Sequence, residues 1–417
     1  MKQIAFFEDE GYKGLYPLTC LRPAWGMLLG GYGLRHSLLL RLGAKKAFYW
    51  SLPERQDVLR AAGLEGQELS QAGLPLFLIN GRARLTARTV NWLAKAETDT
   101  VILSGRTVEA FKIFDKNLLE LVKKNQPTED FINSLVPKMR SFETKDEIFN
   151  HLWELVNYNS RAIAEDFELF KDGGVKLTKG VHLIGKRKDV KIGKGAQILP
   201  GVVLDTTLGP IIIDQKAKVN PPSYIQGPCF IGAESLIDGA KLRPGVSIGH
   251  HCKIAGELEE SIVMHYSNKH HDGFLGHAYL GAWVNLGAQT CNSDLKNNYG
   301  SITVWVNGKF VDSKQIKAGC YIGDHSKTAI GTLINTGAAI GTACNVFGGP
   351  VKKYLPPFSW GCSEKHWEHQ WDKALATVRL VMNRRGQQLD ISQEKMLKKI
   401  FIESKSDRDD LPGEQSK

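Results

Sequence analysis

The sequence predicts an α/β domain at residues 1–170, a parallel β-helix at 175–358 and a helical extension with a polar tail at 359–417. Three observations predict this order. Short apolar runs alternate with helical patterns over the first part of the chain, which is typical of an α/β domain. Aliphatic residues then recur every six positions from about residue 190. The repeat stops near residue 358, and two amphipathic segments follow.

Composition narrows the class of protein. The 417 residues carry a net charge of +10, and only 24% of them are charged, so the chain is globular rather than disordered. No apolar run approaches the ~18 residues that span a bilayer, and the N-terminus does not read as a signal peptide. We therefore expect a cytoplasmic protein with no membrane partner. The seven cysteines form no C-x-x-C pair, which favours reduced structural thiols.

The basic residues do not indicate a nucleic-acid partner. They are scattered along the chain, and no basic stripe interleaves with aromatic residues. The net positive charge instead favours anionic small ligands such as sugar phosphates and nucleotides.

The first domain shows strands at 2–7, 47–50, 74–79 and 101–103, with a helix at 26–42 after the first strand. Strands that alternate with helices predict a parallel sheet. The glycine-containing loop at 11–23 follows the first strand, where α/β domains bind phosphate through backbone N–H groups. Taken alone, this loop is a weak signal that favours an ordinary Gly/Pro turn over a phosphate site.

The period of six predicts the β-helix. In such a fold three hexapeptides complete one coil, the aliphatic side chains point inward, and small residues allow the corners. Glycine often follows the aliphatic residue, as in Ile231-Gly232 and Ile322-Gly323. The periodic positions include Ile192, Ile198, Leu204, Ile225, Ile231, Ile237, Ile248, Ile254, Phe274, Leu280, Leu286, Ile316, Ile322, Thr328, Ile334, Ile340 and Val346.

Two segments interrupt the repeat, and we expect both to be loops that leave the prism. The segment 257–274 contains the pair His270-His271, and the segment 293–315 contains Asn307-Gly308, a hairpin turn signal. Loops that leave a regular scaffold often carry function.

The end of the chain predicts helices at 364–385 and 392–403, with a frayed polar tail at 404–417. An apolar stripe at helical spacing predicts packing rather than ligand binding. Its members are Trp367, Trp371, Leu375, Val378 and Met382.

The stretch 241–292 resembles the acetyltransferase half of the bifunctional enzymes that make UDP-N-acetylglucosamine. That family has R-P-G, then K-A-G-H-L-T-Y-L-G, then V-N-I-G-A-G-T-x-T-C-N-Y. This chain has Arg243-Pro244-Gly245, then the run 267–276, then Val284-Asn285-Leu286-Gly287-Ala288 and Thr290-Cys291-Asn292. The resemblance implies a left-handed β-helix.

The same resemblance implies roles for particular residues. His271 falls on the histidine that acts as general base toward the sugar amine, and a histidine suits that role at neutral pH. Asp272 either orients one of the histidines or is simply solvated. An exposed histidine without a role, or a metal site of His265, His270, His271 and His277, is the competing interpretation. The remaining implied roles are phosphate binding by Arg243, substrate binding by Phe274, Asn285 and Asn292, and acetyl-CoA contact at Ala288.

The first domain resembles sugar-1-phosphate nucleotidyltransferases through Leu15-Tyr16-Pro17-Leu18-Thr19 and Arg22-Pro23. The family signature G-x-G-T-R-L-x-P-L-T-x-x-x-P-K has an arginine where this chain has Gly14 and a lysine where it has Ala24. Those cations hold the triphosphate, so Lys13, Arg22 or Arg35 is expected to substitute.

The magnesium ligands of that family are also altered. The usual Gly-Asp is replaced by Asn80-Gly81-Arg82, and the V-N-N-R motif is similar to the run 156–161, which makes Asn157 a candidate ligand. Asparagine alone is a poor ligand for Mg²⁺, which favours carboxylates.

The chain begins with a strand that contains F-E-D, continues with P-L-T-x-x-R-P, and later has G-D-H-x-K-T-x-I-G-T-L-I-N-T-G at 323–337 and P-P-F-S-W-G at 356–361. Through these motifs it resembles, over nearly its whole length, an alternative bacterial form of this bifunctional enzyme. This resemblance implies acetylation of glucosamine-1-phosphate by acetyl-CoA, uridylyl transfer from UTP with Mg²⁺, and a homotrimer. The alternatives are a sugar nucleotidyltransferase of other specificity with a structural β-helix, or a nucleotide-sugar sensor without catalysis.

Overall fold

The computed structural model describes residues 3–409 and divides the chain into two compact units. The first unit comprises 1–15, 21–27 and 32–151, and the second comprises 16–20, 28–31 and the chain from 152 onward. Among the described residues, no helix combines the length and the apolar composition needed to cross a bilayer. The three-part fold class predicted from the sequence is confirmed.

The first unit is built on one six-stranded sheet in the order β2-β1-β3-β6-β5-β7. The prediction of a parallel sheet is correct for β1, β2 and β3, but β6 runs antiparallel to both of its neighbours. A tight turn at Gly105 joins β5 to β6, and such a turn can only reverse the chain. The strands are β1 Gln3–Glu8, β2 Phe48–Ser51, β3 Leu76–Asn80, β5 Thr100–Ser104, β6 Thr107–Ile113 and β7 Arg140–Glu143, with a small ladder of β4 Ala83–Arg84 and β8 Glu147–Ile148.

Helices cover both faces of this sheet. Helices α1 (Gly33–Leu42) and α3 (Ala87–Lys95) pack on one face, and α4 (Lys116–Lys124) and α5 (Glu129–Leu135) pack on the other. The short α2 (Gln56–Ala61) lies between β2 and β3 in the chain. The helix predicted at 26–42 begins only at Gly33, because Gly30 and Gly33 adopt φ of 64° and 75°, outside the right-handed helical region.

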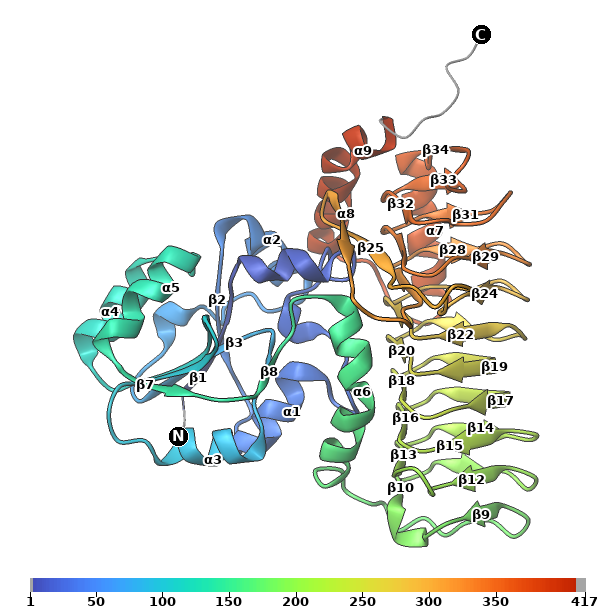
Figure 1. The fold of residues 1–417 in the computed structure, drawn as a ribbon, viewed down its shortest axis with the longest axis horizontal. Coiled ribbons are helices and arrows are strands. Elements are labelled where there is room, and N and C mark those ends of the chain that lie inside the picture. The colour runs from blue at the N-terminus through green and yellow to red at the C-terminus, as the bar shows by residue number, and fades with distance from the viewer. Residues whose placement is uncertain (1–2, 410–417) are drawn as a thin grey trace. The chain divides into compact units, whose positions relative to one another are not determined.

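The second unit is a parallel β-helix whose coils stack in chain order from β9 to β33 (Figure 1). One wall is a nine-stranded sheet of β10 Val190–Ile192, β13 Ile211–Ile213, β16 Cys229–Ile231, β18 Val246–Ile248, β20 Ile262–Val263, β23 Tyr279–Leu280, β27 Cys320–Ile322, β30 Ala338–Ile340 and β32 Tyr354–Leu355. The other strands are β9 His182–Ile184, β11 Gln197–Ile198, β12 Val203–Asp205, β14 Lys218–Asn220, β15 Tyr224–Gln226, β17 Leu236–Leu242, β19 Lys253–Glu259, β21 Asn268–Lys269, β22 Phe274–Gly276, β24 Cys291–Asn292, β28 Lys327–Thr328, β29 Leu333–Ile334, β31 Asn345–Val346, β33 Ser359–Gly361 and β34 His366–Glu368.

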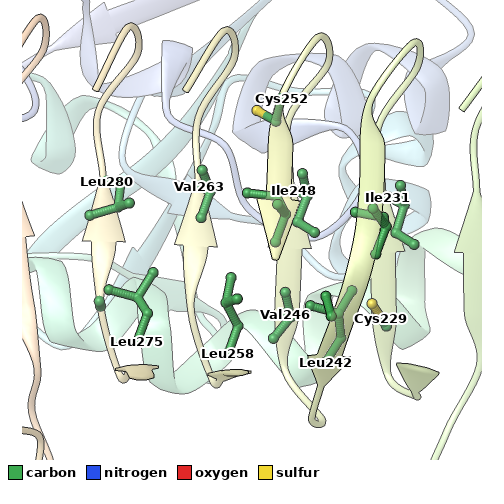
Figure 2. Packing of buried hydrophobic residues seen from close by; sticks show 14 of the residues in the cluster. Cys229, Ile231, Leu242, Val246, Ile248, Cys252, Leu258, Val263, Leu275 and Leu280 are labelled. Atoms are coloured by element: carbon green, nitrogen blue, oxygen red, sulfur yellow. The ribbon is translucent and has the colours of Figure 1, made fainter. Parts of the chain in front are cut away.

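Inward side chains from successive coils stack into one continuous core (Figure 2). Ile231, Ile248, Val263 and Leu280 occupy equivalent positions of four coils and are fully buried. Each such side chain contributes about 1.5–3 kcal/mol by leaving water. Ile316 was counted in the repeat, but it is 59% exposed because it lies in the excursion between β24 and β27.

The two interruptions differ in structure. The segment 293–315 leaves the prism as predicted, and Asn307-Gly308 turns an antiparallel hairpin of β25 Thr303–Val306 and β26 Lys309–Asp312. The segment 257–274 does not leave the prism, and its strands β19 to β22 continue the stack. Its period breaks because Lys269 occupies an inward position, where it pairs with Ile254 of the previous coil. The loop predicted there is therefore wrong.

The extension contains α7 Trp371–Asn383, α8 Ile391–Glu403 and α9 Lys405–Asp409. The predicted start at 364 is wrong, because β33 and β34 form a hairpin that carries Trp367. The predicted stripe packs only in part, since Leu375, Val378 and Met382 are buried whereas Trp367 is 54% exposed. The frayed tail predicted at 404–417 begins instead with α9, where Arg408 bonds Glu368. Residues 410–417 lie outside the described residues. Helix α6, Leu152–Phe167, precedes the β-helix.

Glu109 is a fully buried carboxyl group on β6. Its Oε2 accepts a hydrogen bond from the Thr144 hydroxyl at 2.8 Å. Burial raises the pKa of Glu109 to about 7, although the bond from Thr144 opposes the rise. This pKa lies above the value in an unfolded chain, so the stabilising contribution is complete at acid pH and is lost as pH rises through about 7.

We predict that Glu109→Gln stabilises the protein at alkaline pH. The variant should match the wild type near pH 4.5 and exceed its free energy of unfolding by on the order of 2–3 kcal/mol at pH 8. Denaturant unfolding at both pH values measures the difference. The exposed Glu143→Gln serves as control and should show no such trend. A difference that does not change with pH would contradict the prediction.

Candidate functional site

A cavity of about 340 Å³ opens in the wall of the β-helix. It brings together three residues singled out from the sequence, His271, Asn285 and Ala288. The other residues that line it are Lys253, Asn268, His270, Leu286, Gly287 and Ile330. The cavity is therefore a polar site with a histidine pair, amide groups and one lysine.

The register of the coils places these residues. Asn268 pairs with Lys253 of the coil before it and with Asn285 of the coil after it. Gly273 completes the corner that follows the histidines, with φ of 129°. A Cβ atom at Gly273 would lie 2.3 Å from the backbone oxygen of Thr290, so only glycine fits this close approach.

Lys269 holds the histidine corner from inside the prism. It is 1% exposed, and its Nζ donates hydrogen bonds to the backbone oxygens of His271, at 2.8 Å, and Ala255, at 3.3 Å. Burial lowers the pKa of Lys269 to about 8. The lysine thus fixes the backbone of His271 while the imidazole remains exposed.

The two histidines have different surroundings. Nε2 of His270 lies 3.4 Å from Oδ2 of Asp238, whereas among the described residues His271 forms no ion pair. Their ring centroids are 5.5 Å apart. Asp272 is exposed, and its backbone oxygen accepts a hydrogen bond from Gln289. Asp238, rather than Asp272, is the carboxylate beside the pair.

Three predicted substrate contacts lie outside the residues that line the cavity. Asn292 is buried, and its amide exchanges hydrogen bonds of 2.8 and 2.9 Å with the backbone of Gly276. Arg243 donates through Nε to Glu257 at 2.5 Å, and this bond holds the pKa of Glu257 below its usual range. Phe274 pairs in register with Glu257. Roles for these residues stay predictions, and they require a ligand that reaches beyond the cavity.

The histidine metal site receives no support. Nδ1 of His277 lies 2.8 Å from Oδ2 of Asp294, and the ring of His265 stacks on His250 at 3.8 Å. Over the described part of the chain, no three His, Cys, Asp or Glu side chains converge as metal ligands. No disulfide bond joins cysteines among residues 3–409.

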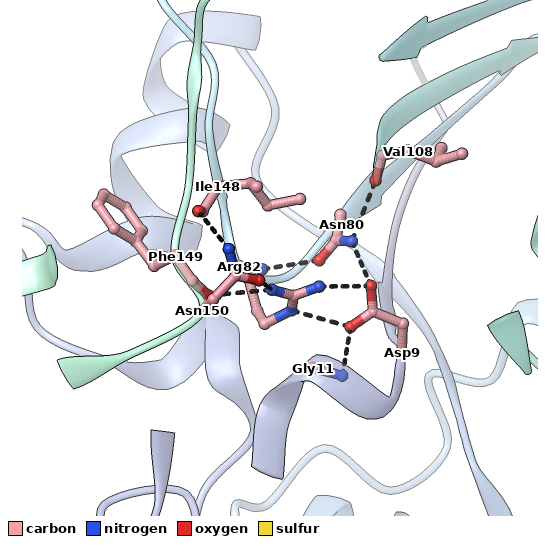
Figure 3. A network of polar contacts seen from close by, with 8 residues as sticks. All are labelled: Asp9, Gly11, Asn80, Arg82, Val108, Ile148, Phe149 and Asn150. Atoms are coloured by element: carbon pink, nitrogen blue, oxygen red, sulfur yellow. Dashed lines mark hydrogen bonds and ion pairs between the residues drawn. The ribbon is translucent and has the colours of Figure 1, made fainter. Parts of the chain in front are cut away.

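In the first unit, the carboxyl ends of β1 and β3 meet where the strand order reverses, the usual position of a ligand crevice in an open α/β sheet. Figure 3 shows that Arg82 occupies this place. Its guanidinium donates two hydrogen bonds to Asp9, at 2.7 and 2.8 Å, and one to Asn150 at 2.7 Å. Asn80 also donates to Asp9, at 2.8 Å. An internal ion pair therefore occupies this position.

A second buried pair supports the loop that was predicted to bind phosphate. Arg55 donates to Glu8 at 2.8 Å and to the backbone oxygen of Arg22 at 3.0 Å, and Glu8 accepts from the N–H of Ala24 at 2.7 Å.

The cations proposed as substitutes for the missing signature residues have partners of their own. Lys13 pairs with Glu10 at 3.1 Å, which raises the pKa of Lys13. Arg35 lies over the ring of Tyr49 at 5.7 Å. Their role in phosphate binding stays a prediction.

The residues present do not fit Mg²⁺ at the predicted ligands. Asn157 is exposed on α6, in the second unit, and Asp9 already binds Arg82. Mg²⁺ prefers carboxylate oxygens in octahedral geometry, which these groups do not offer.

The sequence reading missed Lys253, Asn268 and Lys269. Asn268 precedes the inward position of its coil, as Asn285 does, so its place in the hexapeptide was a usable signal. The sequence pattern did not reveal this place, because the inward residue after Asn268 is a lysine. A charged residue at that position does not continue an aliphatic period.

Residues 4–174 match the family described as sugar nucleotidyl transferase. A bifunctional sugar-1-phosphate nucleotidylyltransferase/acetyltransferase of Sulfurisphaera tokodaii is 27% identical over 56% of this chain and 62% of its own length. The bifunctional protein GlmU of Burkholderia vietnamiensis is 28% identical over 46% and 48%, respectively. The chain thus spans less than two thirds of these relatives.

Among solved structures, the UDP-N-acetylglucosamine acyltransferase of Francisella novicida matches 54% of this chain and 89% of its own. Its sequence identity is 12%, and the TM-score is 0.34.

We predict that Arg82→Met destabilises the protein by about 3–5 kcal/mol, because it leaves the buried Asp9 carboxylate without its partner. Arg60→Met is the matched control, since it breaks an exposed pair with Asp57 and should cost at most about 1 kcal/mol. Denaturant unfolding measures both. Equal, small losses in the free energy of unfolding would show that the Asp9–Arg82 pair does not stabilise the protein more than an exposed pair does.

Proposed function

We propose that the β-helix transfers an acetyl group from acetyl-CoA to the amine of a sugar phosphate, with glucosamine-1-phosphate as the acceptor. The observation that carries the proposal is the cavity, which gathers His271, Asn285 and Ala288 at one place in the wall. Homology to bifunctional nucleotidylyltransferase/acetyltransferases supports the reaction class.

The residues of the cavity suit an acyl transfer to nitrogen. The amine attacks the carbonyl carbon of the thioester, the new C–N bond forms, and the C–S bond breaks to release the CoA thiol. The attacking amine must give up a proton, and the exposed imidazole of His271 accepts it as general base. The protonated imidazole then returns this proton to the departing thiolate, which leaves as the CoA thiol. Lys269 holds the backbone of His271, so the imidazole starts from a fixed anchor.

The first unit would complete a two-step synthesis by uridylyl transfer from UTP to N-acetylglucosamine-1-phosphate. Its match to the sugar nucleotidyl transferase family supports this step. The ion pair between Asp9 and Arg82 favours one of two alternatives for this unit. The unit is then either a sugar nucleotidyltransferase of different specificity or a nucleotide-sugar binding domain without turnover. Pyrophosphate release, assayed with each nucleoside triphosphate, separates these possibilities.

We further propose that the active form is a homotrimer. Ile330 lines the cavity and is 79% exposed, and Leu333 in the same coil is 58% exposed. Large aliphatic side chains that remain exposed beside a site are typical of a surface that a second protein chain covers.

We predict that His271→Ala lowers kcat for CoA release by about 10²–10⁴-fold, the usual contribution of a general base. The assay supplies acetyl-CoA and glucosamine-1-phosphate to the full chain and follows the free thiol. His182→Ala, an exposed histidine of β9, is the matched control and should keep wild-type activity. Wild-type kcat in His271→Ala would overturn the assignment of the base.

We also predict that Lys269→Met lowers kcat/KM about tenfold, because the backbone oxygen of His271 loses its donor and the corner relaxes. The same thiol assay measures it. Lys218→Met, which removes an exposed lysine of β14 that does not line the cavity, shows whether loss of a positive charge alone has this effect. Equal losses in both variants would refute a specific role for Lys269.

A further inference from the structure

Arg385 connects the C-terminal extension to the cavity. It lies in the turn that follows α7 and is half-buried. Its Nη2 donates a hydrogen bond to Oδ1 of Asn268 at 2.8 Å, and its Nη1 donates to the backbone oxygen of His251 at 3.2 Å. One guanidinium thus bonds two coils of the β-helix.

The turn holds Arg385 in place. Met382 of α7 is buried, and its backbone oxygen accepts a hydrogen bond from the N–H of Arg385 at 2.9 Å. Gly386 follows with φ of 65° and ends the helix. The arginine is therefore presented from a rigid element rather than from a free loop.

The bond to Arg385 determines which way the Asn268 amide faces. A guanidinium only donates hydrogen bonds, so the atom of Asn268 that faces it must be the carbonyl oxygen. The amide nitrogen of Asn268 then points to Asn285, where it donates to Oδ1 at 3.2 Å. With its oxygen occupied, Asn285 has its NH₂ group left to offer the cavity.

We propose that Arg385 is a positioning residue that makes Asn285 a hydrogen-bond donor in the cavity. The relay runs from Arg385 through Asn268 to Asn285. It selects a ligand that presents an acceptor oxygen at this point, either a sugar hydroxyl or the carbonyl of the acetyl group. The inference rests on the proposed acetyl transfer and gives the C-terminal extension a part in it.

Substitutions at Asn268 and Arg385 separate the relay from simple packing. In Asn268→Asp, the carboxylate still accepts from Arg385 but has no proton to donate to Asn285, so the Asn285 amide turns its oxygen to the cavity. Arg385→Met removes the donor that orients Asn268. Arg385→Lys keeps a group that only donates.

The test measures kcat/KM for CoA release with the full chain, together with the denaturant midpoint of each variant. We expect about a tenfold loss in both Arg385→Met and Asn268→Asp, and a loss of less than about threefold in Arg385→Lys. Asn268→Asp should unfold at the wild-type midpoint. Arg384→Met, the exposed neighbour of Arg385, is the matched control and should be fully active.

The relay and the proposed acetyl transfer would be overturned by different results. Wild-type kcat/KM in Asn268→Asp, or a loss in Arg385→Met that Arg385→Lys does not reduce, would overturn the relay and leave acetyl transfer intact. No CoA release by the wild-type chain would overturn the proposed function itself.

Discussion

The hydrogen-bond ladder between successive coils is the interaction on which the second unit depends. Each coil pairs in parallel with the coils before and after it, so a residue's place in its hexapeptide decides whether it points inward, points outward or turns a corner. Corners repeat the same backbone conformation, and the rings of His251, Tyr266 and Trp283 stack there with positive φ. A rigid register of this kind places side chains from distant parts of the sequence within contact distance.

The candidate site uses one departure from this regularity. Lys269 takes an inward position that aliphatic residues fill in the neighbouring coils, and burial of its charge opposes folding. Its hydrogen bonds to two backbone oxygens offset part of that cost. The same bonds fix the corner that carries His271. This coil thus has a lysine in place of an aliphatic core residue, and that lysine holds the backbone of His271, the proposed base.

In the first unit, buried charged side chains are paired with side chains of opposite charge. The carboxylates at the end of β1 do not face an open crevice, because Arg55 binds Glu8 and Arg82 binds Asp9. Buried pairs of this kind make the removal of one partner costly. The match of residues 4–174 to the sugar nucleotidyl transferase family therefore does not carry the usual phosphate and metal contacts onto this chain residue by residue. The proposed acetyl transfer is supported by a cavity in the β-helix, and the proposed uridylyl transfer is supported by a family match of the first unit.

The sequence by itself determined the architecture, because burial leaves a local period. The six-residue repeat predicted the coils and most of the core, Asn307-Gly308 predicted the hairpin, and a motif resemblance selected His271, Asn285 and Ala288. Only the tertiary structure decided that Lys269 points inward and that 257–274 stays in the prism. It alone joined Arg385 to Asn268, which lie 117 residues apart. A hydrogen bond across that separation depends on how α7 packs on the coils. No repeating sequence pattern accompanies such a bond, so the sequence alone does not predict it.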